Sequence, residues 1–202
     1  MARTPAEVLR NYRRDQILEA ARQVINENGF ANTSVDQIAQ RAELSRSTVY
    51  QYFASKEELL KGCLAVGREI FVAHLVERID PATSVERQLT AFFEVCLERV
   101  DENREFFRAV AGLESLDGNA ERGDNALVEL IQDFNRVLGQ VLDDAAQRGE
   151  LPAKASPEMR RCFGILIMGA MAARSRQDAP APPTLEAESL SLFAVSGLRG
   201  PR

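Results

Sequence analysis

The sequence contains no tryptophan, a single histidine and only three cysteines among its 202 residues. One histidine leaves little scope for general acid–base chemistry, and no glycine-rich nucleotide-binding loop is present. Adjacent carboxylates such as Asp143 and Asp144 do not face each other on a helix. We therefore expect that the protein is not an enzyme and that it holds no cofactor and no metal.

The cysteines and the apolar runs also exclude several classes of protein. Cys63, Cys96 and Cys162 lack metal-ligand or redox spacing, so we interpret them as small apolar side chains in a reducing compartment. The longest unbroken apolar stretch, residues 162–173, is shorter than the roughly 20 residues that a membrane-spanning helix needs. No secretory signal is visible at the N-terminus. We expect a cytoplasmic protein that does not bind membranes.

Strand patterns are missing, whereas apolar residues recur at helical spacing along the whole chain. We predict an all-α fold of about nine helices, with a small three-helix domain followed by a larger helical bundle. The predicted helices begin after capping residues and end at glycine or proline signals. They cover about residues 5–28, 35–42, 45–53, 55–78, 84–101, 103–114, 124–148, 157–177 and 184–198, with a polar loop over 115–124.

Residues 33–56, TSVDQIAQRAELSRSTVYQYFASK, are the most informative stretch. Two short capped helices stand next to each other there, which is the helix-turn-helix arrangement. The second helix buries Val49 and Phe53, so Ser47 and Gln51 fall on its opposite face. Thr48 and Tyr50 flank that face, and Arg46 lies in the first turn. Such donors, acceptors and a methyl group suit base edges in a major groove.

Charge is distributed unevenly, although the net charge is −5. Residues 1–56 carry +2 and the remainder −7, so only the basic end suits phosphates. The helix starts at Thr33 and Ser55 can accept anions, and Tyr50, Tyr52 and Lys56 can reach phosphate oxygens. Arg3, Arg10, Arg13 and Arg14 suit an arm that follows the backbone or a minor groove. The alternative is a three-helix packing unit whose polar residues merely face water.

Residues 16–60 resemble the DNA-binding domain of the TetR family of regulators. The similarity rests on an Ala-rich first helix ending at Gly29-Phe30 and on a dense run of positions after it. That run comprises Thr33, Val35, Ile38-Ala39, Ala42, Leu44-Ser45, Val49-Tyr50, Tyr52-Phe53 and Ser55-Lys56-Glu57-Glu58-Leu59. Beyond it the resemblance is one of layout, with Gly149-Glu150-Leu151 after the seventh helix and Gly197-Leu198 closing the last.

The resemblance implies a nine-helix homodimer, usually a repressor, that a small molecule releases from DNA. It places Arg46, Ser47, Thr48 and Gln51 near bases, and Thr33, Ser45, Tyr50, Tyr52 and Lys56 near phosphates. One departure is Glu43, where family members commonly have glycine, so we expect a slightly different turn. Tyr52 stands where many members have histidine, and its hydroxyl can still reach a phosphate.

Residues 57–202 form the predicted ligand-sensing and dimerisation domain, after a DNA-binding domain of residues 1–56. A pocket for an apolar or aromatic ligand is expected there, and plain core packing is the alternative for every lining residue. The expected lining is Phe71, Phe92, Phe93, Phe107, Phe134, Phe163 and Met168. The single histidine, His74, is interpreted as a helix-surface or core residue.

The last two helices, near 157–177 and 184–198, are apolar on more than one side, which is typical of a subunit interface. A buried monomer core is the alternative. We predict a repressor that binds a palindromic double-stranded DNA operator and leaves it when ligand shifts the fourth helix. An architectural or cell-division factor without a ligand, and a transcriptional activator, are the remaining candidates.

Overall fold

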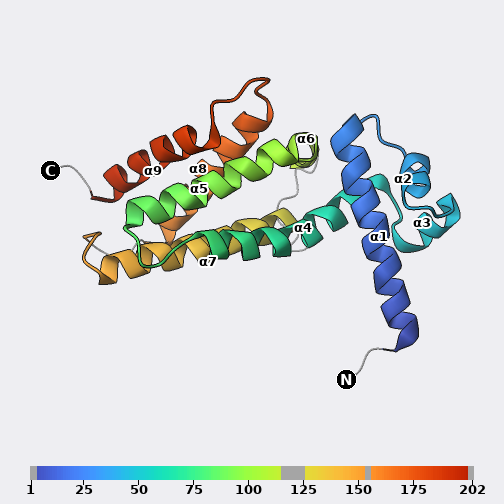
Figure 1. Cartoon of the computed structure of the whole chain (residues 1–202), viewed down its shortest axis with the longest axis horizontal. Coiled ribbons are helices and arrows are strands. Elements are labelled where there is room, and N and C mark those ends of the chain that lie inside the picture. The colour runs from blue at the N-terminus through green and yellow to red at the C-terminus, as the bar shows by residue number, and fades with distance from the viewer. Residues whose placement is uncertain (1–3, 115–125, 153–155, 200–202) are drawn as a thin grey trace. The chain divides into compact units, whose positions relative to one another are not determined.

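The computed structural model describes residues 4–114, 126–152 and 156–199, and within these ranges the chain is helical, without strands (Figure 1). The all-α prediction is confirmed, and the predicted helices lie close to the observed ones. Their bounds are α1 Pro5–Asn28, α2 Val35–Arg41, α3 Arg46–Tyr52, α4 Lys56–Arg78, α5 Val85–Glu102, α6 Arg104–Glu114, α7 Ala126–Gln147, α8 Pro157–Ser175 and α9 Pro183–Arg199. The loop predicted over 115–124 lies outside the described residues.

The chain divides into two compact units. Unit 1 comprises Met1–Gly67 and Arg104–Ala126, and unit 2 comprises Arg68–Asn103 and Leu127–Arg202. The change of unit falls inside α4, whereas the predicted domain boundary between residues 56 and 57 coincides with the first turn of that helix. Helix α6 belongs to the N-terminal unit and packs on α1.

Unit 1 is organised around α1. Thr4 caps this helix by a capping box with Glu7, and Pro5 occupies the first helical position, as the sequence predicts. The helix ends at Gly29, whose φ of 75° is favourable only for glycine. One apolar face of α1 packs against α2 and, at Leu18, against Cys63 near the start of α4. The buried residues include Ile17, Leu18, Ala20, Ala21, Val24, Ile25, Ile38, Ala39, Val49, Phe53, Leu59, Leu60 and Cys63.

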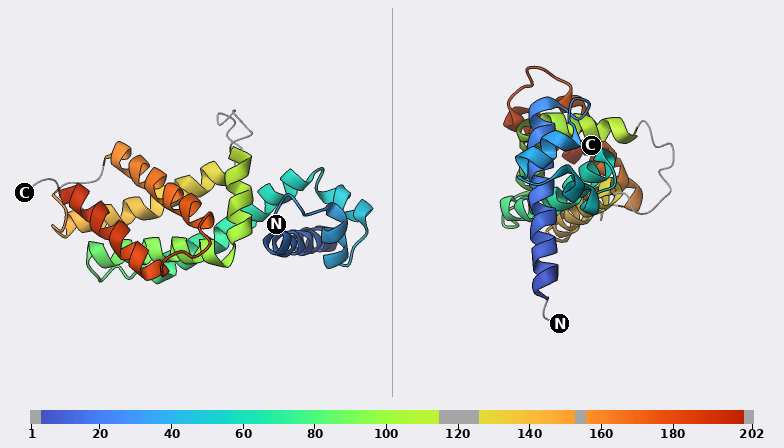
Figure 2. Two further views of the ribbon diagram at one scale, coloured as in Figure 1. Left: turned by 90° about the horizontal axis from the view of Figure 1, so that it is seen from above. Right: turned by 90° about the vertical axis from the view of Figure 1, so that its right-hand side faces the viewer.

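Unit 2 is a bundle of α5, α7, α8, α9 and the C-terminal part of α4. Helix α5 packs most extensively along α9 and next on α8, and two views show α5 and α9 side by side (Figures 1 and 2). Aromatic rings interlock in the interior: Phe134 meets Phe71 and Phe92 edge to face, with ring centroids 5.4 and 6.0 Å apart. Such pairs add to the apolar burial that holds the helices together.

A buried arginine ties three helices of unit 2 together. Arg174, near the end of α8, is 1% exposed and binds both carboxylate oxygens of Asp101 on α5, at 2.9 and 2.6 Å. It also donates to Glu186 on α9 at 2.5 Å and to the Ala181 carbonyl at 3.0 Å. Burial alone would lower the pKa of this guanidinium, but the bonds to Asp101 and Glu186 raise it, so the group stays charged.

Candidate nucleic-acid interface

Helices α2 and α3 form the helix-turn-helix that the sequence predicts. Ser34 is the N-cap of α2, because its hydroxyl accepts from Gln37 N at 3.2 Å and the Gln37 side chain accepts from Ser34 N at 2.7 Å. Ser45 is the N-cap of α3, and its hydroxyl accepts from Thr48 N at 3.1 Å. These bonds satisfy backbone N–H groups that helix starts leave unpaired, so two helices of seven residues each are fixed in place.

The turn between the helices keeps a left-handed residue although glycine is absent. Leu44 N donates to Ala39 O at 2.9 Å and Glu43 N to Gln40 O at 3.1 Å, which is the Schellman pattern. Glu43 occupies the left-handed position with a φ of 55°, the one non-glycine residue of positive φ in the described chain. The expectation of an altered turn was therefore wrong. Glutamate stands where family members commonly have glycine, and the backbone keeps the left-handed conformation.

Helix α3 buries one face and exposes a polar one. Val49 is fully buried and Phe53 nearly so, which confirms the predicted inward pair. Ser47 and Gln51 are exposed on the other side, with Thr48 half-buried at its edge. The hydroxyl of Ser45 lies 2.8 Å from that of Ser47 and 2.7 Å from that of Thr48, which orders the first turn. The exposed face of α3 therefore presents hydroxyls and an amide without a carboxylate.

Arg46 is held by neighbours on both helices. Its Nη1 donates to Asp36 Oδ2 of α2 at 2.9 Å, and its guanidinium lies 5.5 Å from the centre of the Tyr50 ring. Tyr50, through a hydrogen bond, and then the charge of Asp36 raise the pKa of Arg46. Both partners of the ion pair are more than half exposed, so the pair is weak and easily exchanged for another anion.

Lys56 and Thr33 make hydrogen bonds inside the domain that the sequence did not predict. Lys56 Nζ donates to the carbonyls of Phe30 and Thr33, at 2.7 and 3.1 Å, and lies 4.3 Å from the centre of the Phe30 ring. Thr33 is 4% exposed, and its hydroxyl donates inward to Gly29 O at 2.8 Å. This placement argues against phosphate contact by the Thr33 side chain. Lys56 joins α4 to the loop between α1 and α2, and it retains one further N–H.

Two further interactions that support the helix-turn-helix were missed from the sequence. Gln16 on α1 donates to Ala42 O in the turn at 2.7 Å, and Arg41 on α2 makes a bidentate pair with Glu27 of α1 at 2.9 and 2.6 Å. Both link positions that are 14 or more residues apart. A polar residue at the edge of a helix face gives no sign of such a distant partner, so spacing alone could not have found them.

The residues expected to line a ligand pocket are mostly core residues. Those in unit 2 are Phe71, Phe92, Phe93, Phe134 and Phe163, all buried, and Met168, half-buried. Phe107 lies in unit 1, half-buried beside Phe106, with ring centroids 6.1 Å apart. His74 is exposed on α4, in agreement with one of its two interpretations.

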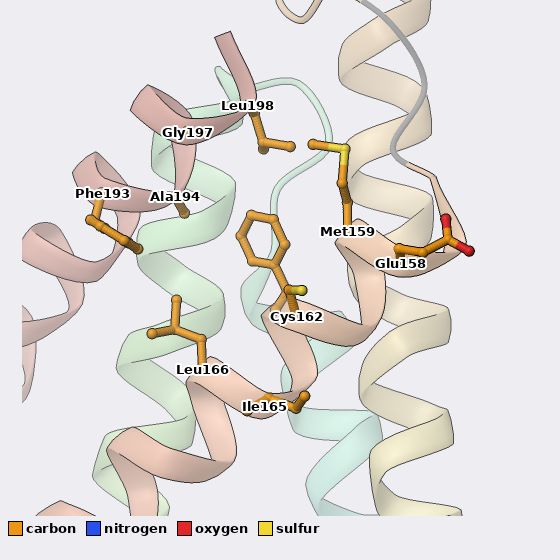
Figure 3. A pocket seen from close by; sticks show the side chains of 10 residues that line it. Glu158, Met159, Cys162, Ile165, Leu166, Phe193, Ala194, Gly197 and Leu198 are labelled. Carbon is orange, nitrogen blue, oxygen red and sulfur yellow. The ribbon is translucent and has the colours of Figure 1, made fainter. Parts of the chain in front are cut away.

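A groove of about 500 Å³ runs between α8 and α9 (Figure 3). Its lining is almost wholly apolar and includes Met159, Cys162, Ile165, Leu166, Phe193 and Leu198. Ile165 is 68% exposed, and Leu192 and Phe193 on α9 are each 69% exposed. Large apolar side chains with this exposure on two neighbouring helices form a patch of the kind that marks a contact surface.

The comparisons with known proteins agree on one family. Residues 17–63 match the model described as "Bacterial regulatory proteins, tetR family", which spans α2, α3 and parts of α1 and α4. Residues 17–63 are a DNA-binding domain of the tetR family. The chain that carries this domain is a DNA-binding transcriptional regulator. None of its described helices is long and apolar enough to cross a bilayer.

The relatives that match a longer part of the chain include two curated regulators. The fatty acid metabolism regulator protein of Bacillus subtilis is 28% identical over 138 residues, 67% of this chain and 69% of that protein. The regulator SrpR of Pseudomonas putida is 31% identical over 143 residues, 69% of this chain and 63% of that protein.

The solved structures that are similar share the fold. The fatty acid degradation regulator FadR of Bacillus halodurans aligns with a TM-score of 0.72 at 21% identity, covering 98% of this chain and 99% of that one. FadR of Bacillus subtilis in complex with stearoyl-CoA aligns with a TM-score of 0.69 at 21% identity, covering 90% and 97%.

Proposed function

We propose that the protein is a transcriptional repressor that binds an inverted-repeat operator as a homodimer and leaves it when an apolar effector binds. The observation that carries the DNA-binding half is the polar, carboxylate-free face of α3, held outward by the burial of Val49 and Phe53. In the major groove this face brings Ser47, Thr48 and Gln51 to base edges. Arg46 exchanges Asp36 for an acceptor on DNA.

Phosphate contacts fall to the residues that surround this face. Ser45 and Tyr50 are exposed at the two ends of α3, and Tyr52 is half-exposed. Two N–H groups of the Lys56 ammonium donate to the carbonyls of Phe30 and Thr33, and the third can donate to a phosphate oxygen. Thr33 is left out of this set, because its hydroxyl is bonded inside the domain. Such contacts position the protein without reading sequence.

The apolar groove between α8 and α9 is proposed as the seam between two copies of the chain. Ile165, Leu192 and Phe193 expose large apolar surfaces. They lie on the two helices for which the sequence predicts a subunit interface. Four helices joined about a twofold axis would remove these surfaces from water. The seam would then hold two copies of α3 about one DNA turn, 34–36 Å, apart.

The effector we propose is a fatty acyl thioester of coenzyme A. Unit 2 has a phenylalanine-rich interior, and an acyl chain can replace ring-on-ring packing with apolar contacts. The chain also resembles FadR of Bacillus subtilis, which binds stearoyl-CoA. Binding in the interior would shift α4, which belongs to both units, and so change the separation of the two copies of α3.

Selection of bound duplexes from a random DNA pool tests the first half of the proposal. We expect an enriched inverted repeat with half-sites about one turn apart. Gln51→Ala should relax preference at one or two positions of each half-site, whereas Tyr52→Phe should weaken all sequences alike. Identical effects of the two substitutions would contradict the division into base and phosphate contacts, and the absence of enrichment would contradict the operator itself.

Release of the selected duplex by acyl-CoA tests the second half. Stearoyl-CoA should lower DNA affinity, and coenzyme A without an acyl chain serves as the matched control. By linkage, DNA must lower acyl-CoA affinity by the same factor. Unchanged DNA binding at saturating acyl-CoA would refute this effector class while leaving the operator intact.

An activator is the second candidate function, because one relative is the transcriptional activator FasR of Mycolicibacterium smegmatis, 29% identical over 101 residues. A reporter gene placed downstream of the selected operator distinguishes repression from activation. Loss of the protein raises reporter expression if it is a repressor and lowers expression if it is an activator.

A further inference from the structure

The N-terminal part of α1 extends beyond the packed body of unit 1. Every residue from Thr4 to Asp15 is exposed, and Gln16 is the first that is half-buried. Residues 5–15 form about 16 Å of helix at 1.5 Å per residue. Figure 1 shows this part of α1 projecting past α2 and α3, and we call it the α1 overhang, residues 4–15.

Two contacts fix where the overhang leaves the domain. Gln16 Nε2 donates to Ala42 O in the helix-turn-helix turn at 2.7 Å. The Arg14 guanidinium lies 5.5 Å from the centre of the ring of Phe53, the residue that ends α3. The overhang therefore begins directly beside the turn and the end of α3.

The overhang carries three arginines on one side. At 100° per residue, Arg13, Arg10 and Arg14 lie within an arc of about 100° around the helix axis. This side continues the face that buries Ile17 and Ala21 against the helix-turn-helix. Val8, Leu9 and Tyr12 lie away from it.

These arginines lack the carboxylate partners that most others have. In the described part of the chain, ion pairs engage Arg22, Arg41, Arg46, Arg68, Arg78, Arg99, Arg108, Arg136, Arg148, Arg160, Arg174 and Arg199. Arg10 and Arg13 have no such partner among the described residues, and Arg14 contacts only a ring. In an acidic chain of net charge −5, a side with unpaired arginines suits a polyanion.

The overhang is held as a helix by its cap. Glu7 Oε2 accepts from Thr4 N at 2.7 Å and from Thr4 Oγ1 at 2.9 Å. The backbone bond, and then the side-chain bond, lower the pKa of Glu7. Glu7 is thus occupied at the helix end. Of the arm expected from the sequence, Arg10, Arg13 and Arg14 lie on a helix, and Arg3 lies outside the described residues.

We infer that the α1 overhang is a second DNA-binding element, which follows the phosphate backbone just outside the bases that α3 reads. The inference rests on the proposed operator binding and extends its footprint. About 16 Å corresponds to roughly five base pairs at 3.4 Å each. The exposed apolar side of Val8, Leu9 and Tyr12 favours a protein partner instead, but it faces away from the arginines and from the end of α3.

The test compares two duplexes that contain the selected operator, one ending at the half-sites and one extended by about ten base pairs on each side. Wild-type full-length protein should bind the extended duplex more tightly. Arg10→Gln/Arg13→Gln should bind both alike. Four lost phosphate contacts per dimer should reduce the slope of log affinity against log salt by about 3 to 4.

The matched control removes the same charge from unit 2. Arg87 is exposed, and Arg136 has only a surface pair with Asp133 at 2.8 Å. Arg87→Gln/Arg136→Gln should keep the wild-type salt slope and the preference for the long duplex. Equal binding of both duplexes by the wild type, or an unchanged slope in the overhang variant, overturns the inference and leaves the operator standing. Failure of the wild type to select any sequence overturns both.

Discussion

Glu43 offers a substitution whose effect can be worked out from the backbone alone. Its φ of 55° lies in the left-handed region, which costs a residue with a Cβ atom about 1 to 2 kcal/mol. Glycine removes that strain but loses about 0.5 to 1 kcal/mol through greater freedom in the unfolded chain. Glu43→Gly should therefore stabilise the protein by about 0.5 to 1 kcal/mol, which raises Tm by roughly 1 to 4 °C.

The same motif at the end of α7 supplies the reverse experiment. Gly149 N donates to Ala146 O at 3.1 Å and Glu150 N to Ala145 O at 2.9 Å, with a φ of 77° at Gly149. A Cβ atom at this position would meet nothing within 4 Å, so backbone strain is its only penalty. Gly149→Ala should destabilise the protein by about 1 kcal/mol.

Glu43→Ala separates backbone strain from charge. Alanine keeps the Cβ atom and removes the carboxylate, so its stability should match that of the wild type. Both substitutions should strengthen nonspecific DNA binding equally, because each removes one negative charge beside the recognition helix. Urea unfolding and DNA binding at several salt concentrations measure the two effects. Equal stabilisation by alanine and glycine would refute the strain argument.

Three further substitutions or reactions test the internal contacts. Lys56→Met should cost about 2 kcal/mol in urea unfolding, because two carbonyls lose a charged donor, and Lys56→Arg should recover part of it. Arg174→Met should cost about 3 kcal/mol, at the low end for a buried pair because its carboxylate partners are partly exposed; Arg174→Lys cannot restore the bidentate bond. Burial raises the pKa of Cys63 to about 12 and raises that of Cys96 further, so in the native protein neither should react with a thiol reagent at pH 8. Cys162 is exposed beside the groove and should be protected from the reagent in the proposed dimer. In a Phe193→Glu variant, whose charge opposes the seam, Cys162 should react. Equal reaction rates in the wild type and this variant would contradict the seam.

Much of unit 1 was predictable because its signals are local. A capping residue, a glutamine or glutamate three positions later and an apolar face of three or four residues act within one or two turns of helix. The bounds of α2 and α3 and the burial of Val49 and Phe53 follow from them. The turn was the exception. Propensity disfavours a left-handed glutamate, but the two Schellman hydrogen bonds and the packing around Ala39 hold Glu43 in that conformation.

Contacts between distant segments were not predictable, and they change the meaning of several residues. Lys56 resembles a surface lysine beside a helix start, yet its ammonium is bonded to a loop 23 and 26 residues away. Arg174 ends an apolar helix and suggests a solvated terminus, yet it is almost fully buried, because carboxylates 73 and 12 residues away surround it. Charge type and helical spacing give no information on such partners.

The sequence also fails to predict which apolar side chains of unit 2 are exposed. Phe134 has polar and charged neighbours in the sequence and Phe193 has apolar and small ones, yet the first is fully buried and the second is 69% exposed. Only the packing of α5 on α9 decides which side of α9 faces inward, and it leaves Leu192 and Phe193 outside with Ile165 of α8. An outward apolar side on a helix that is already packed requires a further partner to be removed from water. The second copy proposed here satisfies that requirement for both helices at once, because a twofold axis presents the same groove to itself.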